Sequence, residues 1–291
     1  MKCSAEFFGL KELPDLDISR DTLEALAEKS TGMGITVPGV QKKLSLHLSD
    51  DDSSRLTLVG YPAGYILKPQ TEDFNQLPEA EDLTMDIAEL MGVRTSPHGL
   101  IELDGELAYI TKRADRADGM IYAMEDFCQL SGRLSEDKYK GSYERCGAVI
   151  SKYSTRVGFD LTELFLRLVV CFVTGNSDMH LKNFSLIEKT PGERDFVLSP
   201  AYDLLPVNIV MPEDKEETAL TLNGKKTRIK RDDFIAMAAK TGLNRKATDN
   251  IIASVIRCKG DAEAIIKKSY LSDEMKNAFI ALMEERMERI S

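Results

Sequence analysis

Hydrophobic and polar residues alternate with a period of two in the first third of the chain. Leu44, Leu46 and Leu48 fall on one side of such a run, with Ser45 and His47 on the other. This alternation predicts a β-strand with one face turned towards a core. Four more strands are predicted by similar short runs at residues 56–59, 65–68, 100–103 and 107–111.

One helix is predicted between these strands. Leu83, Ile87 and Leu90 form its apolar face, at the three- and four-residue spacing of a helix. Pro78 lies near its start, and Gly92 is placed as a C-terminal capping glycine would be. The first third of the chain therefore predicts a small β-rich lobe that carries one helix.

Helical spacing dominates the chain after about residue 115. Residues 160–173 are apolar on nearly all sides, which predicts a buried helix, and Asp160 with Glu163 form a capping-box pattern at its start. Short strands are expected at residues 184–187 and 196–198, and further helices from residue 231 onward. The predicted fold class is α+β, with an N-lobe of residues 1–115 and a larger helical C-lobe of residues 116–291.

The composition of the chain argues against several classes of protein, including membrane-spanning proteins and general nucleic-acid binders. The 291 residues are 43% hydrophobic and 30% charged, and the longest apolar run is far shorter than the roughly 20 residues that cross a bilayer. A formal net charge of −10 argues against a general nucleic-acid binder. No signal-peptide core opens the chain, and the five cysteines form no CxxC pair. We therefore expect a cytoplasmic protein with reduced thiols and no zinc cluster.

A polar segment, residues 174–184, follows the predicted buried helix. It holds Asp178 and, five residues later, Asn183, and Asp203 lies twenty residues further on. In protein-kinase phosphoryl transfer, a base Asp, an Asn ligand and a second acidic ligand have this layout. One carboxylate orients the attacking hydroxyl, while the other two groups hold Mg²⁺ against the ATP phosphates. Alternatively, Asp178 and Asn183 are turn residues that hydrogen-bond to nearby backbone.

The N-terminal lobe offers further candidates. Three glycines in residues 32–39 precede the first strand, and their backbone N–H groups could cover phosphates, although such glycines also occur in ordinary loops. Lys68 ends a strand, where its ammonium would meet phosphate or water. Glu81 could pair with Lys68, as the helix glutamate of a kinase does. It could equally be an acid that the helix N-terminus favours.

Six motifs, in order, resemble those of the HipA family of toxin serine/threonine kinases. They are a Gly-x-Gln-x-Lys loop within residues 35–43, the strand 65–68, a hinge at 112–116, a Glu-Asp-x-Cys-Gln helix start at 125–129, the segment 175–184 and Tyr202-Asp203. The segment Gly-Asn-x-Asp-x-His-x-Lys-Asn-Phe is a specific signature. This resemblance implies a bilobal protein-kinase-like fold with a small β-rich N-lobe and a larger helical C-lobe.

The resemblance also implies a role for each site residue. Asp178 would be the catalytic base, and Asn183 with Asp203 would hold Mg²⁺. His180 would lie near the phosphates or would brace its own loop. ATP would be bound by Pro38, Gly39, Val40, Gln41, Lys42, Lys43, Lys68, Lys112, Arg113, Ala114, His180, Lys182, Asn183, Tyr202 and Asp203.

Thr36 stands where loops of this family commonly carry an autophosphorylated serine. A phosphate there would add about −1.5 to −2 charges beside the ATP phosphates and would expel the loop, so an inhibitory switch is expected. The hydroxyl could instead satisfy a turn. About thirty residues precede the loop, so the chain resembles a short form of the family. In that form a separate small protein supplies the N-terminal subdomain, and a helix-turn-helix antitoxin completes the complex and contacts DNA.

The predicted function is transfer of the ATP γ-phosphate to a protein hydroxyl within a toxin-antitoxin system. The family suggests an aminoacyl-tRNA synthetase as the target. Two other functions remain open: a kinase-like subunit that holds an antitoxin on DNA, and a small-molecule phosphotransferase. Residues 225–231 carry five cations beside the acidic run 213–217. A solvated hairpin is favoured there over a docking face for an RNA-bound or acidic protein substrate.

Overall fold

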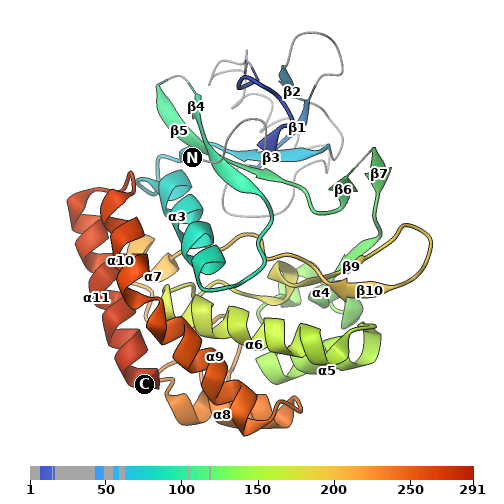
Figure 1. Cartoon of the computed structure of the whole chain (residues 1–291), viewed down its shortest axis with the longest axis vertical. Helices are drawn as coiled ribbons and strands as arrows, with labels where there is room; N and C mark the ends of the chain where they lie inside the picture. The colour runs from blue at the N-terminus through green and yellow to red at the C-terminus, as the bar shows by residue number, and fades with distance from the viewer. Residues whose placement is uncertain are drawn as a thin grey trace. The chain divides into compact units, whose positions relative to one another are not determined.

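The computed structural model describes residues 7–14, 16, 43–48, 55–58, 63–103, 105–117 and 119–291 (Figure 1). The chain forms two compact units. The first comprises residues 1–82 and 96–120, and the second comprises residues 83–95 and 121–291. The first holds a β-sheet and the second most of the helices, which confirms the predicted α+β class. The division into lobes of residues 1–115 and 116–291 remains our proposal for the domain organisation.

The first unit is built on a five-stranded antiparallel sheet of order β2-β1-β3-β5-β4. Its strands are β1 (Leu44–Leu48), β2 (Leu56–Leu58), β3 (Tyr65–Lys68), β4 (His98–Leu103) and β5 (Glu106–Lys112). Leu44 and Leu46 of β1 are buried with Leu67 of β3 and Ile110 of β5 in one apolar cluster. The period-two pattern therefore predicted both the strand and its buried face.

Helix α3 (Leu77–Leu90) begins in the first unit and ends in the second. Gly92 ends it with a φ of +92°. The Gly92 N–H donates to the Glu89 carbonyl at 2.9 Å, and the Val93 N–H donates to the Ala88 carbonyl at 2.9 Å. These two bonds form a Schellman cap, which confirms the capping role that the sequence predicted for Gly92.

Helix α6 (Val157–Val173) lies at the centre of the second unit and contacts α5, α9 and α11 (Figure 1). Phe165 and Phe172 of α6 pack edge-on against Phe234 of α8. The other helices of this unit are α4 (Phe127–Leu130), α5 (Tyr143–Tyr153), α7 (Val207–Val210), α8 (Arg231–Lys240), α9 (Arg245–Arg257), α10 (Lys259–Lys268) and α11 (Asp273–Ile290). Because most residues of α6 are buried, it can serve as a core helix.

The start of α6 differs from the sequence-based prediction. The helix begins at Val157 with Arg156 as its N-cap, so Asp160 is not a capping residue. Asp160 is fully buried, and its Oδ2 accepts hydrogen bonds from Ser154 Oγ at 2.6 Å and from the Leu198 N–H at 2.8 Å. The carboxylate thus satisfies a strand backbone group, which a local capping pattern could not reveal.

A second sheet, of order β10-β9-β8, frames the polar 174–184 loop. Its strands are β8 (Met124–Asp126), β9 (Ser185–Glu188) and β10 (Phe196–Leu198), and β9 starts one residue after the loop. The loop itself contains the 3-10 turn η2 (Leu181–Asn183), and a second 3-10 turn, η1 (Ser135–Asp137), lies earlier in the chain. A short ribbon of β6 (Arg116–Ala117) and β7 (Met120–Ile121) lies where the chain leaves the first unit. Among the described residues, no helix combines the length and apolarity needed to cross a bilayer.

Candidate active site

The 174–184 loop begins where α6 ends in a left-handed turn. Gly175 has a φ of +74°. Its N–H donates to the Phe172 carbonyl at 3.2 Å, and the Asn176 N–H donates to the Cys171 carbonyl at 2.8 Å. This is again the bond pattern of a Schellman cap, so the Gly-Asn pair turns the chain out of the buried C-terminal end of α6.

Replacing Gly175 with alanine is expected to lower the free energy of unfolding by about 1–3 kcal/mol. The new Cβ would sit on a backbone with positive φ and would lie 2.5 Å from Leu282 Cδ2 and 3.4 Å from Asn208 Cβ. Thermal unfolding followed by circular dichroism measures the loss. Gly158→Ala, in the first turn of the same helix, is the matched control because no atom lies within 4 Å of its added Cβ. Equal midpoints for the two variants would contradict this account.

Four hydrogen bonds hold Asp178 in the loop. Its N–H donates to Asn176 Oδ1 at 3.1 Å. Its carbonyl accepts from Asn183 Nδ2 at 3.0 Å and from the His180 N–H at 2.8 Å. Its carboxylate Oδ1 accepts from the Tyr139 hydroxyl at 2.6 Å. The side chain of Asp178 is partly exposed. The loop therefore presents a carboxylate on a fixed backbone to an incoming ligand.

Asn183 and Asp203 fit the metal-ligand role that the sequence predicts. Asn183 is 4% exposed, and because its amide nitrogen is bonded to the Asp178 carbonyl, its amide oxygen is directed elsewhere. Asp203 has a φ of +61°, a conformation that non-glycine residues adopt rarely and often at functional sites. An amide oxygen and a carboxylate are suitable ligands for Mg²⁺, and these two residues would hold it.

His180 is buried beside Asp178. Burial lowers the pKa of His180, and the charge of Asp178 opposes this shift only in part. The imidazole edge meets the Tyr139 ring with centroids 5.0 Å apart, and among the described residues Nδ1 has no hydrogen-bond partner. The ring is thus held by packing, and its phosphate contact remains a prediction.

In the first unit, Lys68 and Glu81 form a buried ion pair. Lys68 Nζ of β3 lies 2.5 Å from Glu81 Oε1 of α3, and the two side chains are 4% and 1% exposed. The Lys68 ammonium also lies 5.3 Å from the centre of the Tyr109 ring. The sequence left open whether Glu81 pairs with Lys68 or only favours the helix start, and the structure shows the pair. A strand lysine held by a helix glutamate is the arrangement that protein kinases use to bind ATP phosphates.

The profile of the HipA-like C-terminal domain matches residues 35–262. The chain belongs to this family. Y4dM of Sinorhizobium fredii, named as a candidate kinase, is 33% identical over 250 residues, which cover 79% of this chain and 59% of that protein. A candidate kinase of Haemophilus influenzae is 29% identical over 291 residues, covering 89% and 82%. This HipA-like chain thus spans less than two thirds of the length of Y4dM.

Two solved structures share the fold. HipA of Shewanella oneidensis, in a toxin-antitoxin complex with HipB and operator DNA, matches with a TM-score of 0.72 and 19% identity, over 88% of this chain and 64% of HipA. The Helicobacter pylori proinflammatory kinase CtkA matches with a TM-score of 0.60 and 15% identity, over 85% and 93%. These likenesses confirm the predicted kinase-like fold of this HipA-like chain.

The structure gives Lys182 a local partner. Its Nζ lies 2.6 Å from Asp126 Oδ2. Asp126 is the N-cap of α4, where it forms a capping box with Gln129. The Glu-Asp-x-Cys-Gln motif of this HipA-like chain therefore starts a helix and anchors the 174–184 loop. The ATP contact expected for Lys182 remains a prediction.

Tyr202 braces the same loop. Its hydroxyl donates to the Lys182 carbonyl at 3.0 Å and lies 2.6 Å from Ser185 Oγ. Burial raises the pKa of Tyr202, so the phenol stays protonated at neutral pH. The bracing interaction fixes the residue just before Asp203, while a direct ATP contact of Tyr202 remains a prediction.

The predicted hinge contains a charged cluster. The Arg113 guanidinium donates to both carboxylate oxygens of Asp115, at 2.9 and 2.7 Å, and Arg116 Nη1 donates to Asp115 Oδ2 at 2.7 Å. Lys112 ends β5, and Ala114 follows Arg113 in a turn. This cluster stiffens the segment that the family resemblance places next to adenine.

The predicted phosphate loop lies mostly outside the described residues. Thr36, Pro38, Gly39, Val40, Gln41 and Lys42 fall there. Lys43 directly precedes β1. Their roles remain predictions from the sequence.

Two residues that support the loop were missed by the sequence analysis. Tyr139 bonds to Asp178 across 39 residues of chain, and Asp214 accepts from Ser177 Oγ at 2.6 Å across 37. No periodicity or short motif connects such distant positions, so these contacts become visible only in the folded chain.

Two of the basic residues in 225–231 are paired with nearby acids. Lys225 Nζ lies 2.8 Å from Asp233 Oδ1, and Lys226 Nζ lies 3.0 Å from Glu216 Oε2. These ion pairs favour the interpretation of this segment as a solvated, self-paired surface.

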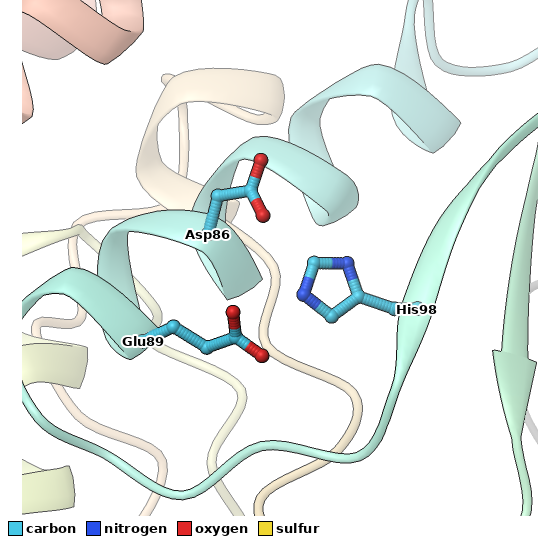
Figure 2. Close-up of side chains that lie close together, drawn as sticks. All are labelled: Asp86, Glu89 and His98. Atoms are coloured by element: carbon cyan, nitrogen blue, oxygen red, sulfur yellow. The ribbon is translucent and has the colours of Figure 1, made fainter. Parts of the chain in front are cut away.

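Figure 2 shows three side chains outside the predicted site, Asp86 and Glu89 of α3 and His98 of β4. In the first unit, His98 Nδ1 lies 2.8 Å from Asp82 Oδ1. In the second unit, Glu89 Oε1 accepts from Thr95 Oγ1 at 2.5 Å. Because the three side chains are divided between the two units, we assign them no metal ion.

Proposed function

We propose that this HipA-like chain is a serine/threonine protein kinase that transfers the γ-phosphate of ATP to a protein hydroxyl. The observation that carries the proposal is the fixed carboxylate of Asp178, tied through its own backbone to Asn183. The kinase-like fold and the candidate-kinase relatives support it. The buried pair of Lys68 and Glu81 adds support from the first unit.

In the proposed reaction, Asp178 accepts the proton of the attacking hydroxyl and orients its oxygen towards the γ-phosphate. Lys68, held by Glu81, neutralises charge on the ATP phosphates. Asn183 and Asp203 would hold Mg²⁺, and the ion would supply positive charge to stabilise the transferring phosphate. The side chains of the site are held in fixed positions. The chain therefore accelerates phosphoryl transfer mainly by orienting the reacting groups and by stabilising charge.

We also propose that this kinase is the toxin of a toxin-antitoxin system. The structural match to HipA in its complex with HipB and operator DNA supports a helix-turn-helix antitoxin as partner. The same match favours a second candidate function, a kinase-like subunit whose main role is to hold an antitoxin on DNA. We further propose that a separate small protein supplies the N-terminal subdomain. The proposed target of the kinase is an aminoacyl-tRNA synthetase.

The proposed activity is tested by incubating the intact chain with Mg²⁺ and ATP labelled at the γ-phosphate. The intact mass is measured first, because a chain that is already phosphorylated would take up little label. We expect label on Thr36 or a neighbouring hydroxyl, mapped by mass spectrometry, and none in an Asp178→Ala control. Phosphate at Thr36 would place about −1.5 to −2 charges in the phosphate loop, so the labelled form should bind ATP more weakly.

Three results would contradict the kinase proposal. An unmodified chain that neither binds ATP nor takes up label would favour the antitoxin-binding function instead. Equal labelling of the Asp178→Ala control would show that the phosphate comes from a contaminating kinase. Label on a small hydroxyl compound but never on protein would point to a small-molecule phosphotransferase.

A further inference from the structure

The hydrogen bonds of Asp178 distinguish its two carboxylate oxygens. Oδ1 accepts from the Tyr139 hydroxyl at 2.6 Å. Among the described residues, no hydrogen bond reaches Oδ2. The backbone N–H and carbonyl of Asp178 are bonded to Asn176 and Asn183. The backbone is therefore held in place, and the hydrogen bond from Tyr139 restrains the two torsions of the side chain.

Tyr139 is itself held firmly against the loop. The Leu181 N–H of the loop donates to the Lys138 carbonyl at 3.1 Å. The Arg133 guanidinium donates to the Lys140 carbonyl. Both neighbours of Tyr139 are thus bonded through their backbones, which anchors the chain on either side of a residue that is itself 44% exposed.

The Tyr139 hydroxyl keeps its proton and can therefore always donate a hydrogen bond. Burial and the hydrogen bond to Asp178 raise the pKa of Tyr139, and the charges of Asp178, Asp203 and Asp214 add to this rise. The phenol therefore remains protonated at neutral pH. Its ring meets His180 edge-on and lies under the Lys138 ammonium at 5.0 Å, so the side chain has contacts besides its hydroxyl.

We propose that Tyr139 is a positioning residue that holds Oδ1 of Asp178 and so turns Oδ2 towards the substrate hydroxyl. A carboxylate that rotates freely would present the accepting oxygen in the correct direction for only part of the time. Misplacement of a reacting group by about 1 Å can cost about 100-fold in rate. This inference rests on the proposed kinase function, and it adds a residue that the motifs of the 174–184 loop do not contain.

The test compares Tyr139→Phe with a matched control, Tyr143→Phe. The Tyr143 hydroxyl also donates to the loop, to the Met179 carbonyl at 3.1 Å, but does not touch Asp178. For each variant of the intact chain, kcat and KM are measured from ADP formation with Mg²⁺ and ATP, and the dissociation constant for MgATP is measured by calorimetry. Tyr139→Phe should lower kcat by about 10- to 100-fold while the dissociation constant stays within about twofold. Tyr143→Phe should lower the melting temperature and keep kcat within about twofold of the wild type.

A double-mutant cycle tests the contact without turnover. The melting-temperature shifts of Tyr139→Phe and Asp178→Ala should not add in the double variant, because each change alone removes the one hydrogen bond that the two side chains share.

Additive shifts, or a Tyr139→Phe kcat within about twofold of the wild type, would overturn the inference. An equal loss of kcat in Tyr143→Phe would also overturn it, because any loosening of the loop would then suffice. A wild-type chain that neither binds MgATP nor forms ADP would overturn the proposed function, and this inference with it.

Discussion

An Asp178→Asn variant is expected to lose about 10²- to 10⁴-fold in phosphoryl-transfer rate while it keeps its fold. The amide has nearly the same shape as the carboxylate, and its oxygen can still accept from the Tyr139 hydroxyl. It cannot take a proton from the attacking hydroxyl, so the loss falls on the chemical step. Single-turnover labelling at saturating ATP measures the rate, and circular dichroism measures the unfolding midpoint.

The control for this prediction is Asp137→Asn. Asp137 lies in η1, a few residues from Tyr139, and pairs with Lys140 through a contact of 2.6 Å. This change removes one negative charge from the segment that carries Tyr139 without altering the 174–184 loop, so the rate should stay within about twofold of the wild type. If both variants slowed equally, the effect would be one of local charge, and Asp178 would not be the base.

A Lys68→Met variant is expected to lose about 3–5 kcal/mol of stability, because it leaves the Glu81 carboxylate buried without its cation. Both side chains are nearly inaccessible to water, at 4% and 1% exposure, so solvent cannot replace the lost partner. MgATP binding should fall as well. The chain has no tryptophan, so urea unfolding is best followed by far-ultraviolet circular dichroism.

A double variant, Lys68→Met with Glu81→Leu, separates stability from function. Removing both charges should restore most of the lost stability, because an apolar pair can replace a buried ion pair at little cost. It should not restore MgATP binding. Lys259→Met breaks an exposed pair with Glu284 and should leave the midpoint almost unchanged. If the double variant regained full ATP binding, Lys68 would have only a structural role.

Much of the fold could be predicted from local patterns. The strands around Leu46 and Leu67 and the capping glycine Gly92 follow from periodicity and backbone geometry, which depend on near neighbours. The start of α6 could not be predicted, because Asp160 bonds to a strand 38 residues away. Burial of that carboxylate outweighs the capping pattern that its own sequence neighbourhood suggested.

Some residues of the candidate site could be predicted from the sequence, and others could not. The spacing of Asp178 and Asn183 and the family resemblance predicted that the two residues act together, and the structure adds a hydrogen bond between them. The partner of Lys68 stayed undecided from the sequence, because a glutamate near a helix start has two physical explanations. Tyr139 left no signal in the sequence. Its importance depends on a contact between distant parts of the chain, which no short motif encodes.

The left-handed backbone at Asp203 also limits how this position can change during evolution. Its neighbours are fixed, since Tyr202 is hydrogen-bonded and Leu204 is 1% exposed, so the bend persists whatever side chain it carries. Most residues pay about 1–2 kcal/mol in this conformation, whereas glycine and asparagine adopt it readily. In relatives that have lost phosphoryl transfer, substitution of residue 203 by asparagine or glycine is therefore expected before substitution by alanine or valine. The residue found at this position would then indicate that the activity has been lost.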